Sequence, residues 1–237
     1  KTKRVAYLPN AKKLLFSMTQ LGNGLDDAGL YEEWLNVLEV DLANETRFGA
    51  CEVSLLQTRC HMAICYSKLD RDEEALALRR EIYHKSLALR PSSNDVFTDA
   101  LNLSFSLRSM ERYAEAHSLL HDHLPEARRA FGAEGEAFLQ IRWNYAWCLS
   151  QDDESSRDDV REAVGILEEL FQTTLRILGP THPFTKTVED NLDDAHYTFA
   201  CLAAEASTAS EEEESEEESE SDESEVSFNW PPDKDNN

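Results

Sequence analysis

The feature that most constrains this chain is a pair of apolar-periodic segments closed by a glycine-proline stop, between residues 143 and 183. The first segment contains Asn144-Tyr145-Ala146, and the second has apolar residues at helical spacing from 163 to 170. The stop is Leu178-Gly179-Pro180-Thr181-His182-Pro183. Two antiparallel helices of this length cannot bury an apolar face alone, so neighbouring copies must cover it. The expected fold is therefore an array of helix pairs.

Copies of this unit occur on its N-terminal side in the same register. Small residues recur 41 and 42 residues apart, and each is followed by an alanine and two larger residues at matching places. The third unit is delayed by five residues, which the polar loop from Gln151 to Arg157 supplies. Small residues let paired helices approach closely, and larger ones fill the space between pairs. The matching columns are Ala63, Ser104 and Ala146; Ala75, Ala116 and Ala163; Leu78, Leu119 and Ile166; and Ile82, His123 and Leu170.

The pattern predicts an all-α protein, a right-handed superhelical solenoid of about four antiparallel helix pairs plus a capping helix. Residues 1–10 are expected to be an irregular basic N-terminus, residues 11–206 the helical domain, and residues 207–237 a disordered acidic tail. The expected units are about 11–50, 51–94, 95–136 and 137–183, with a cap at 184–206. The expected helices are 11–21, 27–47, 51–69, 72–89, 96–110, 112–131, 137–149, 158–178 and 185–204.

The charge and the cysteines of the chain argue against nucleic-acid binding and against a disulfide-bonded, secreted protein. The net charge is −24, and about half of it comes from residues 207–237, where 13 acidic residues face one lysine. Direct nucleic-acid binding is not expected, because it needs a basic footprint. The five cysteines form no CxxC pair, which favours reduced thiols and a cytoplasmic location. No secretory signal is visible, and no apolar run approaches the roughly 18–20 residues that span a bilayer, so membrane association is not expected.

The repeat is similar to the tetratricopeptide repeat, in the long form found in kinesin light chains and related interaction proteins. Units of that family contain an Asn-Leu-Ala segment, an alanine early in the second helix, and a closing Leu-Gly-Pro-x-His-Pro. The resemblance covers about residues 52–204 and, more weakly, 11–51. Its motifs appear as Asn102-Leu103-Ser104, Asn144-Tyr145-Ala146, Asn191-Leu192-Asp193 and the complete stop at 178–183.

Three departures from the family pattern matter for the fold. His61 stands where the first clear unit would have its asparagine, and Arg90-Pro91 replaces the closing glycine of that unit. Pro125 falls inside an expected second helix. Because an interior proline removes a hydrogen bond and clashes with the preceding turn, a bend is expected there.

The resemblance implies a scaffold that binds short peptide segments of partner proteins in a groove lined by the first helices of the pairs. In that family the asparagine contacts the bound peptide backbone, since an amide offers both donors and an acceptor. Asn102 and Asn144 are the corresponding candidates. The alternative is that these side chains cap turns or bridge neighbouring helices, which is favoured for Asn191.

The same register gives the expected groove an apolar lining. Residues three before and one after the small residue should face inward, and Arg108 and Arg142 are the nearest basic side chains. Because there is no ladder of lysine and arginine, a clamp for a charged chain terminus is disfavoured. A row of apolar side chains this long is not expected to face water. A partner peptide or another part of this chain could cover it. If the register is shifted by one residue, the row is instead part of the core. The row is Cys60, Ile64, Leu101, Phe105, Trp143 and Trp147.

No pattern in the sequence indicates catalysis, and no cofactor or metal is expected. His117 and His121 have a four-residue spacing that can hold a metal, but no glutamate follows the first histidine as in zinc proteases. A metal-dependent enzyme centred there is a minor alternative. The leading alternative to a scaffold is the helical regulatory or substrate-recruiting part of a larger enzyme whose catalytic region precedes Lys1.

The acidic tail is expected to act separately from the helices. The stretch from Glu211 to Glu225 is too charged to fold, and Ser210, Ser215 and Ser219 each have an acid three residues on, a context that acidophilic kinases favour. The aromatic end, Val226 to Pro232, resembles a short linear motif that could dock intramolecularly into the apolar groove or into another chain. The alternative is a solubilising tail.

Overall fold

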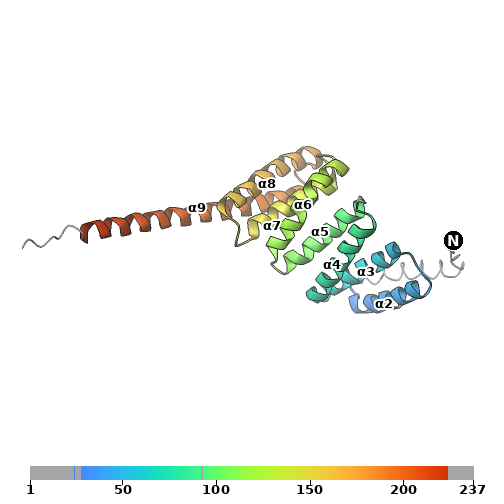
Figure 1. Ribbon diagram of the computed structural model, residues 1–237. Coiled ribbons are helices and arrows are strands. Elements are labelled where there is room, and N and C mark those ends of the chain that lie inside the picture. The colour runs from blue at the N-terminus through green and yellow to red at the C-terminus, as the bar shows by residue number, and fades with distance from the viewer. Residues whose placement is uncertain (1–23, 25–27, 92, 224–237) are drawn as a thin grey trace, which may run out of the picture.

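The computed structural model describes residues 24, 28–91 and 93–223, with side chains described up to residue 204. Over these residues the protein is helical and has no strand. Successive helices pack against each other along the chain, as Figure 1 shows. The helices are α2 (Tyr31–Arg47), α3 (Glu52–Lys68), α4 (Asp72–Leu89), α5 (Asn94–Ser109), α6 (Tyr113–Phe131), α7 (Glu136–Gln151), α8 (Arg157–Leu178) and α9 (Pro183–Glu223).

The turns within the pairs show that the repeat is structural. Asp70 joins α3 to α4 with a φ of 56°, and Glu111 joins α5 to α6 with a φ of 58°. The next residue in each turn donates its backbone N–H back into the preceding helix at 2.9 Å, Arg71 to Tyr66 and Arg112 to Leu107. Left-handed residues that close a helix in this way redirect the chain within one residue. Equivalent turns therefore start equivalent second helices.

The columns found in the sequence form the buried seams of the solenoid. All six small residues that were predicted to allow close approach have no solvent exposure. The last column is also buried, including its one polar member, His123, which is 7% exposed. The third column, Leu78, Leu119 and Ile166, is half-buried. Burial at matching positions of successive pairs is expected of repeats that share one continuous core. The predicted all-α solenoid is confirmed.

Apart from the end of α9, described below, the predicted boundaries agree with the helices to within two residues except at the start of α2. It begins at Tyr31 rather than near residue 27, because Gly29 adopts a φ of 70° in a turn just before it. The helix predicted for 11–21 lies outside the described residues. Arg90, which replaces a closing glycine, ends α4 with an extended φ of −149°, whereas Gly132 and Gly179 end α6 and α8 with positive φ.

Pro125 does not end α6, which continues through it to Phe131. The proline is exposed to solvent, so the carbonyl that it leaves unpaired can be hydrated. The bend expected at this position stays a prediction.

Helix α9 differs most from the expected domain plan. Its packed part lies near its start, where Thr185, Val188 and Ala195 are fully buried. The sequence predicts a disordered tail from residue 207, but the helix continues to Glu223 and projects away from the helical body (Figure 1). Glutamate and alanine are good helix formers, and no glycine or proline interrupts the chain between Pro183 and Pro231. Residues 224–237 lie outside the described residues.

Buried His123 makes stability depend on pH. Its Nε2 lies 2.9 Å from the Tyr83 hydroxyl, and burial lowers its pKa below the ordinary 6.5, against smaller opposing effects of Glu126 and Asp122. A folded state with a lowered histidine pKa binds fewer protons than the unfolded state, so its stability is complete above pH 6.5 and declines as pH falls below that value. We expect the free energy of unfolding, measured in urea, to fall on acidification, and the fall to be smaller in His123→Gln. His121→Gln, on the exposed side of the same helix, should keep the parental pH dependence.

Candidate peptide-binding face

Asn144, which the repeat places at a ligand-contact position, lies entirely inside the protein. Its exposed fraction is 0%, and it joins α7 to α5. Its amide nitrogen donates to Ser104 Oγ, and its oxygen accepts from Arg108 Nη1 at 2.6 Å and from Cys148 Sγ at 3.8 Å. No surface of this side chain remains for a peptide. The structure shows the alternative, a bridge between neighbouring helices, and a ligand contact at Asn144 stays a prediction that this arrangement does not favour.

Arg108 covers the two tryptophans of α7. Its guanidinium carbon lies 3.7 Å from the ring centre of Trp147 and 5.1 Å from that of Trp143, and the exposed ring of Phe105 lies 5.3 Å away. We call these four residues the arginine–tryptophan cluster. Removal from water lowers the pKa of Arg108, and its Nε is buried without a partner in the described structure. Stacking on aromatic rings and the bond to Asn144 offset part of that desolvation cost.

The cluster is closed on its other side by α9. Trp143 Nε1 donates to Asn191 Oδ1 at 2.8 Å, and the Trp143 ring packs edge-on against Phe184 at 5.9 Å. Asn191 therefore bridges two helices, as the sequence favoured. The part of the predicted apolar row that lies on α7, Trp143 and Trp147, is therefore covered by this chain's own side chains, and both tryptophans are half-buried.

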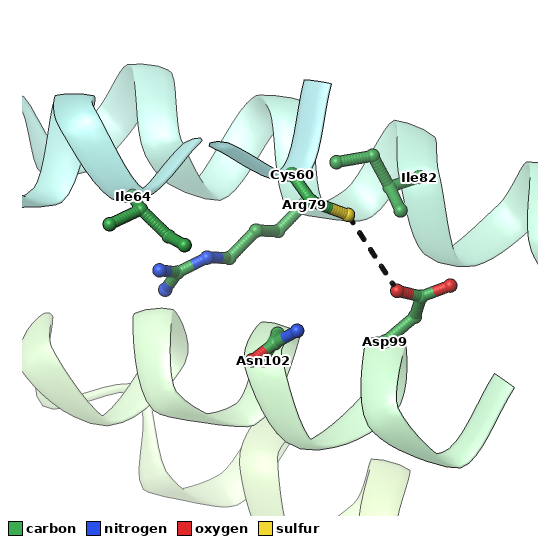
Figure 2. Close-up of a pocket in the computed structure, with 6 residues that line it drawn as sticks. All are labelled: Cys60, Ile64, Arg79, Ile82, Asp99 and Asn102. Atoms are coloured by element: carbon green, nitrogen blue, oxygen red, sulfur yellow. Dashed lines mark hydrogen bonds between the residues drawn. The ribbon is translucent and has the colours of Figure 1, made fainter. Parts of the chain in front are cut away.

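A second feature of the same face is a small pocket between α3, α4 and α5, drawn in Figure 2. Its volume of about 30 Å³ is enough for one or two water molecules. Cys60 and Ile64 come from α3, and Asn102 comes from α5, all three predicted to line the groove. The remaining lining residues are Arg79 and Ile82 of α4 and Asp99 of α5.

Cys60 and Asp99 point toward each other across the pocket, whereas the Arg79 guanidinium extends toward Ile64 (Figure 2). Cys60 Sγ lies 3.9 Å from Asp99 Oδ1, and Arg79 Nη1 donates to Ser106. Burial and the nearby Asp99 carboxylate raise the pKa of the Cys60 thiol to about 12, so the thiol is protonated at neutral pH. A protonated, hydrogen-bonded thiol is a poor nucleophile. The chemistry offered here is hydrogen bonding.

Two further residues that were predicted to line the groove, both on α5, differ in solvent exposure. Leu101 is 8% exposed and packs in the core with Phe97 and Leu120, and its role as a ligand contact stays a prediction that this burial does not favour. It lies on the side of α5 that meets the following pair. Phe105, one turn further along α5, is 42% exposed and is the large apolar side chain that this face presents to solvent.

Within the described structure Asn102 is half-buried beside the pocket, and its side chain makes no hydrogen bond there.

Sequence reasoning missed the polar half of the pocket. Arg79 lies three residues before Ile82, a position used to establish the repeat, and Asp99 lies three residues before Asn102. Residues three apart share a helix face, so this spacing could have placed both at the pocket. Arg142, expected near the groove, instead pairs with Glu169 of α8 at 2.7 Å.

The described residues do not form a metal site or a membrane-spanning helix. They contain no group of three or more histidine, cysteine, aspartate or glutamate side chains placed to hold a metal. His117 pairs with Asp152 at 3.2 Å, and His121 is exposed. None of the helices that the structure describes is long and apolar enough to cross a membrane. The possible phosphorylation sites Ser210, Ser215 and Ser219 lie in the projecting part of α9, where side chains are not described.

Comparisons with known proteins agree with this architecture. Residues 100–135, which cover α5 and α6, match the family model of the tetratricopeptide repeat. No curated protein matches the sequence significantly.

Solved structures show the same fold over most of the chain. A protein described as a kinesin light chain from Podosopora anserina, with nearly identical TPR-like repeats, has 19% identity and a TM-score of 0.65, covering 80% of this chain and 89% of that one. A variant of that protein with one glutamine replaced by methionine has 18% identity and a TM-score of 0.67, covering 83% and 92%. BtubC (BKLC) from P. vanneervenii has 12% identity and a TM-score of 0.55, covering 95% and 86%.

The fold and the match together define a helical solenoid of tetratricopeptide-like repeats. Within that class, this chain is most simply described by its similarity to the kinesin light chain type of repeat. Such repeats generally mediate protein–protein interaction.

Proposed function

We propose that the face formed by α3, α5 and α7 binds a short, partly apolar segment of a partner protein. The proposal rests mainly on Phe105, a member of the arginine–tryptophan cluster that is 42% exposed and lies one helical turn after Asn102 of the polar pocket. An exposed aromatic side chain flanked by hydrogen-bonding groups is the usual composition of an interaction hot spot. The expected function is that of a scaffold without catalytic activity.

Each part of this face has a distinct role in the proposed complex. Phe105 and the outer edges of Trp143 and Trp147 would contact an apolar or aromatic side chain of the ligand. Asn102 would donate to and accept from the ligand backbone, because its amide is free to do both. Asn144 and Asn191 would hold the helices in place without touching the ligand.

The chain's own C-terminal segment is a weaker candidate for this face. Helix α9 carries residues 207–223 away from the helical body (Figure 1), so docking onto α5 in the same chain would require the helix to break. Separate partner proteins that carry a linear motif meet no such obstacle.

A peptide selection tests the proposal. A random peptide library is selected on the full chain, and the affinities of the recovered peptides are measured by fluorescence anisotropy. We expect Phe105→Ala to weaken binding at least about tenfold, since aromatic anchors cost about 2 kcal/mol or more when truncated. Asn102→Ala should weaken it less.

Phe48→Ala is the matched control, because Phe48 is also exposed, at 47%, but lies at the end of α2 and away from this face. The proposal fails if selected peptides bind the Phe105 and Phe48 variants equally well.

A further inference from the structure

A larger pocket lies on a different surface, between α6, α7 and α8. It has a volume of about 600 Å³ and is lined by Arg128, Arg129 and Arg142 around a floor that includes Leu124, Pro125 and Phe138. We call it the arginine pocket. Its one acidic lining residue is Glu169. Three arginines around one pocket are unusual in a chain whose net charge is −24.

The arginines of this pocket are weakly held by the chain itself. In the described structure Arg128 has no carboxylate within 4 Å. Arg129 has one carboxylate partner, Glu126 at 3.7 Å, and its Nε donates to the Pro125 carbonyl at 3.3 Å. Arg142 lies 5.8 Å from the Phe138 ring centre and pairs with Glu169, whose side chain is 72% exposed. The Arg142 side chain is 21% exposed, so this pair is partly shielded, whereas both members of the Arg129–Glu126 pair are exposed. An exposed pair contributes little to stability and exchanges readily for another carboxylate. The pocket therefore offers up to three guanidinium groups to an anionic ligand.

Charge distinguishes this pocket from another of similar size. The second pocket, about 590 Å³, lies where the start of α6 meets the end of α7, and acidic residues outnumber its single arginine. An acidic ligand would be repelled there and attracted to the arginine pocket. Its acidic lining residues are Glu111, Glu115, Asp152, Asp153 and Glu154.

We propose that the arginine pocket binds the acidic C-terminal segment, residues 211–237, of a second copy of this chain. The segment has 13 acidic residues and one lysine, and Phe228 and Trp230 follow its acidic run. Carboxylates match the arginine rim, and an aromatic side chain matches the apolar floor.

The geometry of α9 points to a second copy. Residues 211–223 project away from the helical body in Figure 1, so they are available to a neighbouring molecule. The pocket and the segment are different surfaces, so each copy can accept one segment and donate another. Such a head-to-tail contact forms rings or open chains, and the mean mass rises with concentration.

Sedimentation velocity on the full chain tests this inference. We expect the mean mass to rise with protein concentration at low ionic strength and to return to the monomer mass in high salt, because the contact is between exposed charges. A synthetic peptide of residues 207–237 should also return it to the monomer mass by occupying the pocket.

Two double variants locate the contact. Arg128→Gln with Arg129→Gln should weaken association about tenfold, since each lost exposed pair is worth up to about fivefold. Arg157→Gln with Arg161→Gln removes the same charge from exposed positions at the start of α8, outside the pocket, and should leave association unchanged.

A charge exchange completes the test. A chain with Arg128→Glu and Arg129→Glu should associate poorly with itself, but should associate with a chain in which Glu211–Glu214 are replaced by lysine. The inference is overturned if the parent stays monomeric at every concentration, if the two arginine pairs behave alike, or if the exchanged chains fail to associate. None of these outcomes bears on peptide binding at Phe105, which is measured separately.

Discussion

Replacing Leu167 by alanine should lower the free energy of unfolding by about 3–5 kcal/mol, the range for a fully buried leucine whose cavity cannot collapse. Leu167 of α8 has an exposed fraction of 0% and belongs to the core cluster that α5, α6, α7 and α9 also share. Because each pair in a solenoid contacts only its neighbours, lost packing here is not compensated from elsewhere. Urea unfolding followed by tryptophan fluorescence measures the change, since Trp143 packs against the same cluster.

Leu178→Ala is the control for this experiment. It makes the same change on the same helix at a position that is 38% exposed, so the expected loss is below about 1 kcal/mol. Equal losses for the two variants would mean that the central pair does not form the core described here.

Replacing Asn144 by alanine should lower the free energy of unfolding by about 2–4 kcal/mol. This is more than the loss of a few side-chain atoms alone would cause. The substitution leaves Ser104 Oγ without its amide partner and removes the one hydrogen bond that the half-buried Arg108 makes within the described part of the chain. Unpaired buried polar groups cost about 1–3 kcal/mol each, and more when charged. The same urea experiment gives the value.

The other two repeat asparagines provide matched comparisons. Asn102→Ala should change stability by less than about 1 kcal/mol, because this half-buried side chain has no recorded bond in the described structure. Asn191→Ala removes a single bond, to Trp143, and should cost about 1 kcal/mol. If all three variants lose the same stability, the bridging role assigned to Asn144 is wrong.

A combined change separates loss of the amide from loss of the arginine. Arg108→Met keeps an unbranched side chain over Trp147 but removes the charge. In that background, Asn144→Ala should cost less than in the parent, because no buried guanidinium is left unpaired.

The helical array was predictable because its signal is local and repeated. The columns that contain Ala63, Ala116 and Leu170 each recur at fixed spacing, and periodicity of this kind fixes which side of a helix is buried. The boundaries that differed depended on backbone conformation at single residues, such as the positive φ of Gly29 before α2. The end of α9 beyond residue 206 was not predicted, because two opposing effects act there. Helix propensity favours continuing the helix and repulsion between the acidic side chains opposes it, and composition alone does not show which effect is larger.

The candidate site was predicted only in part. The structure places Cys60, Ile64 and Asn102, which the repeat register assigned to a groove, around one pocket and leaves Phe105 exposed, while their role in binding stays a prediction. It treated Asn102 and Asn144 as equivalent, although one is half-buried beside the pocket and the other is fully enclosed.

By itself, the sequence determined the class of fold, the pairing of the helices and the identity of the buried seams, because a repeat encodes its own core. Only the tertiary structure decided which face residues remain free. Asn144 is enclosed because Arg108 and Ser104 reach it from the preceding pair, and Trp143 is half-covered because Asn191 and Phe184 reach it from the following helix. Which side chain meets which across two repeats depends on their relative placement in space, and no spacing within one repeat carries that information.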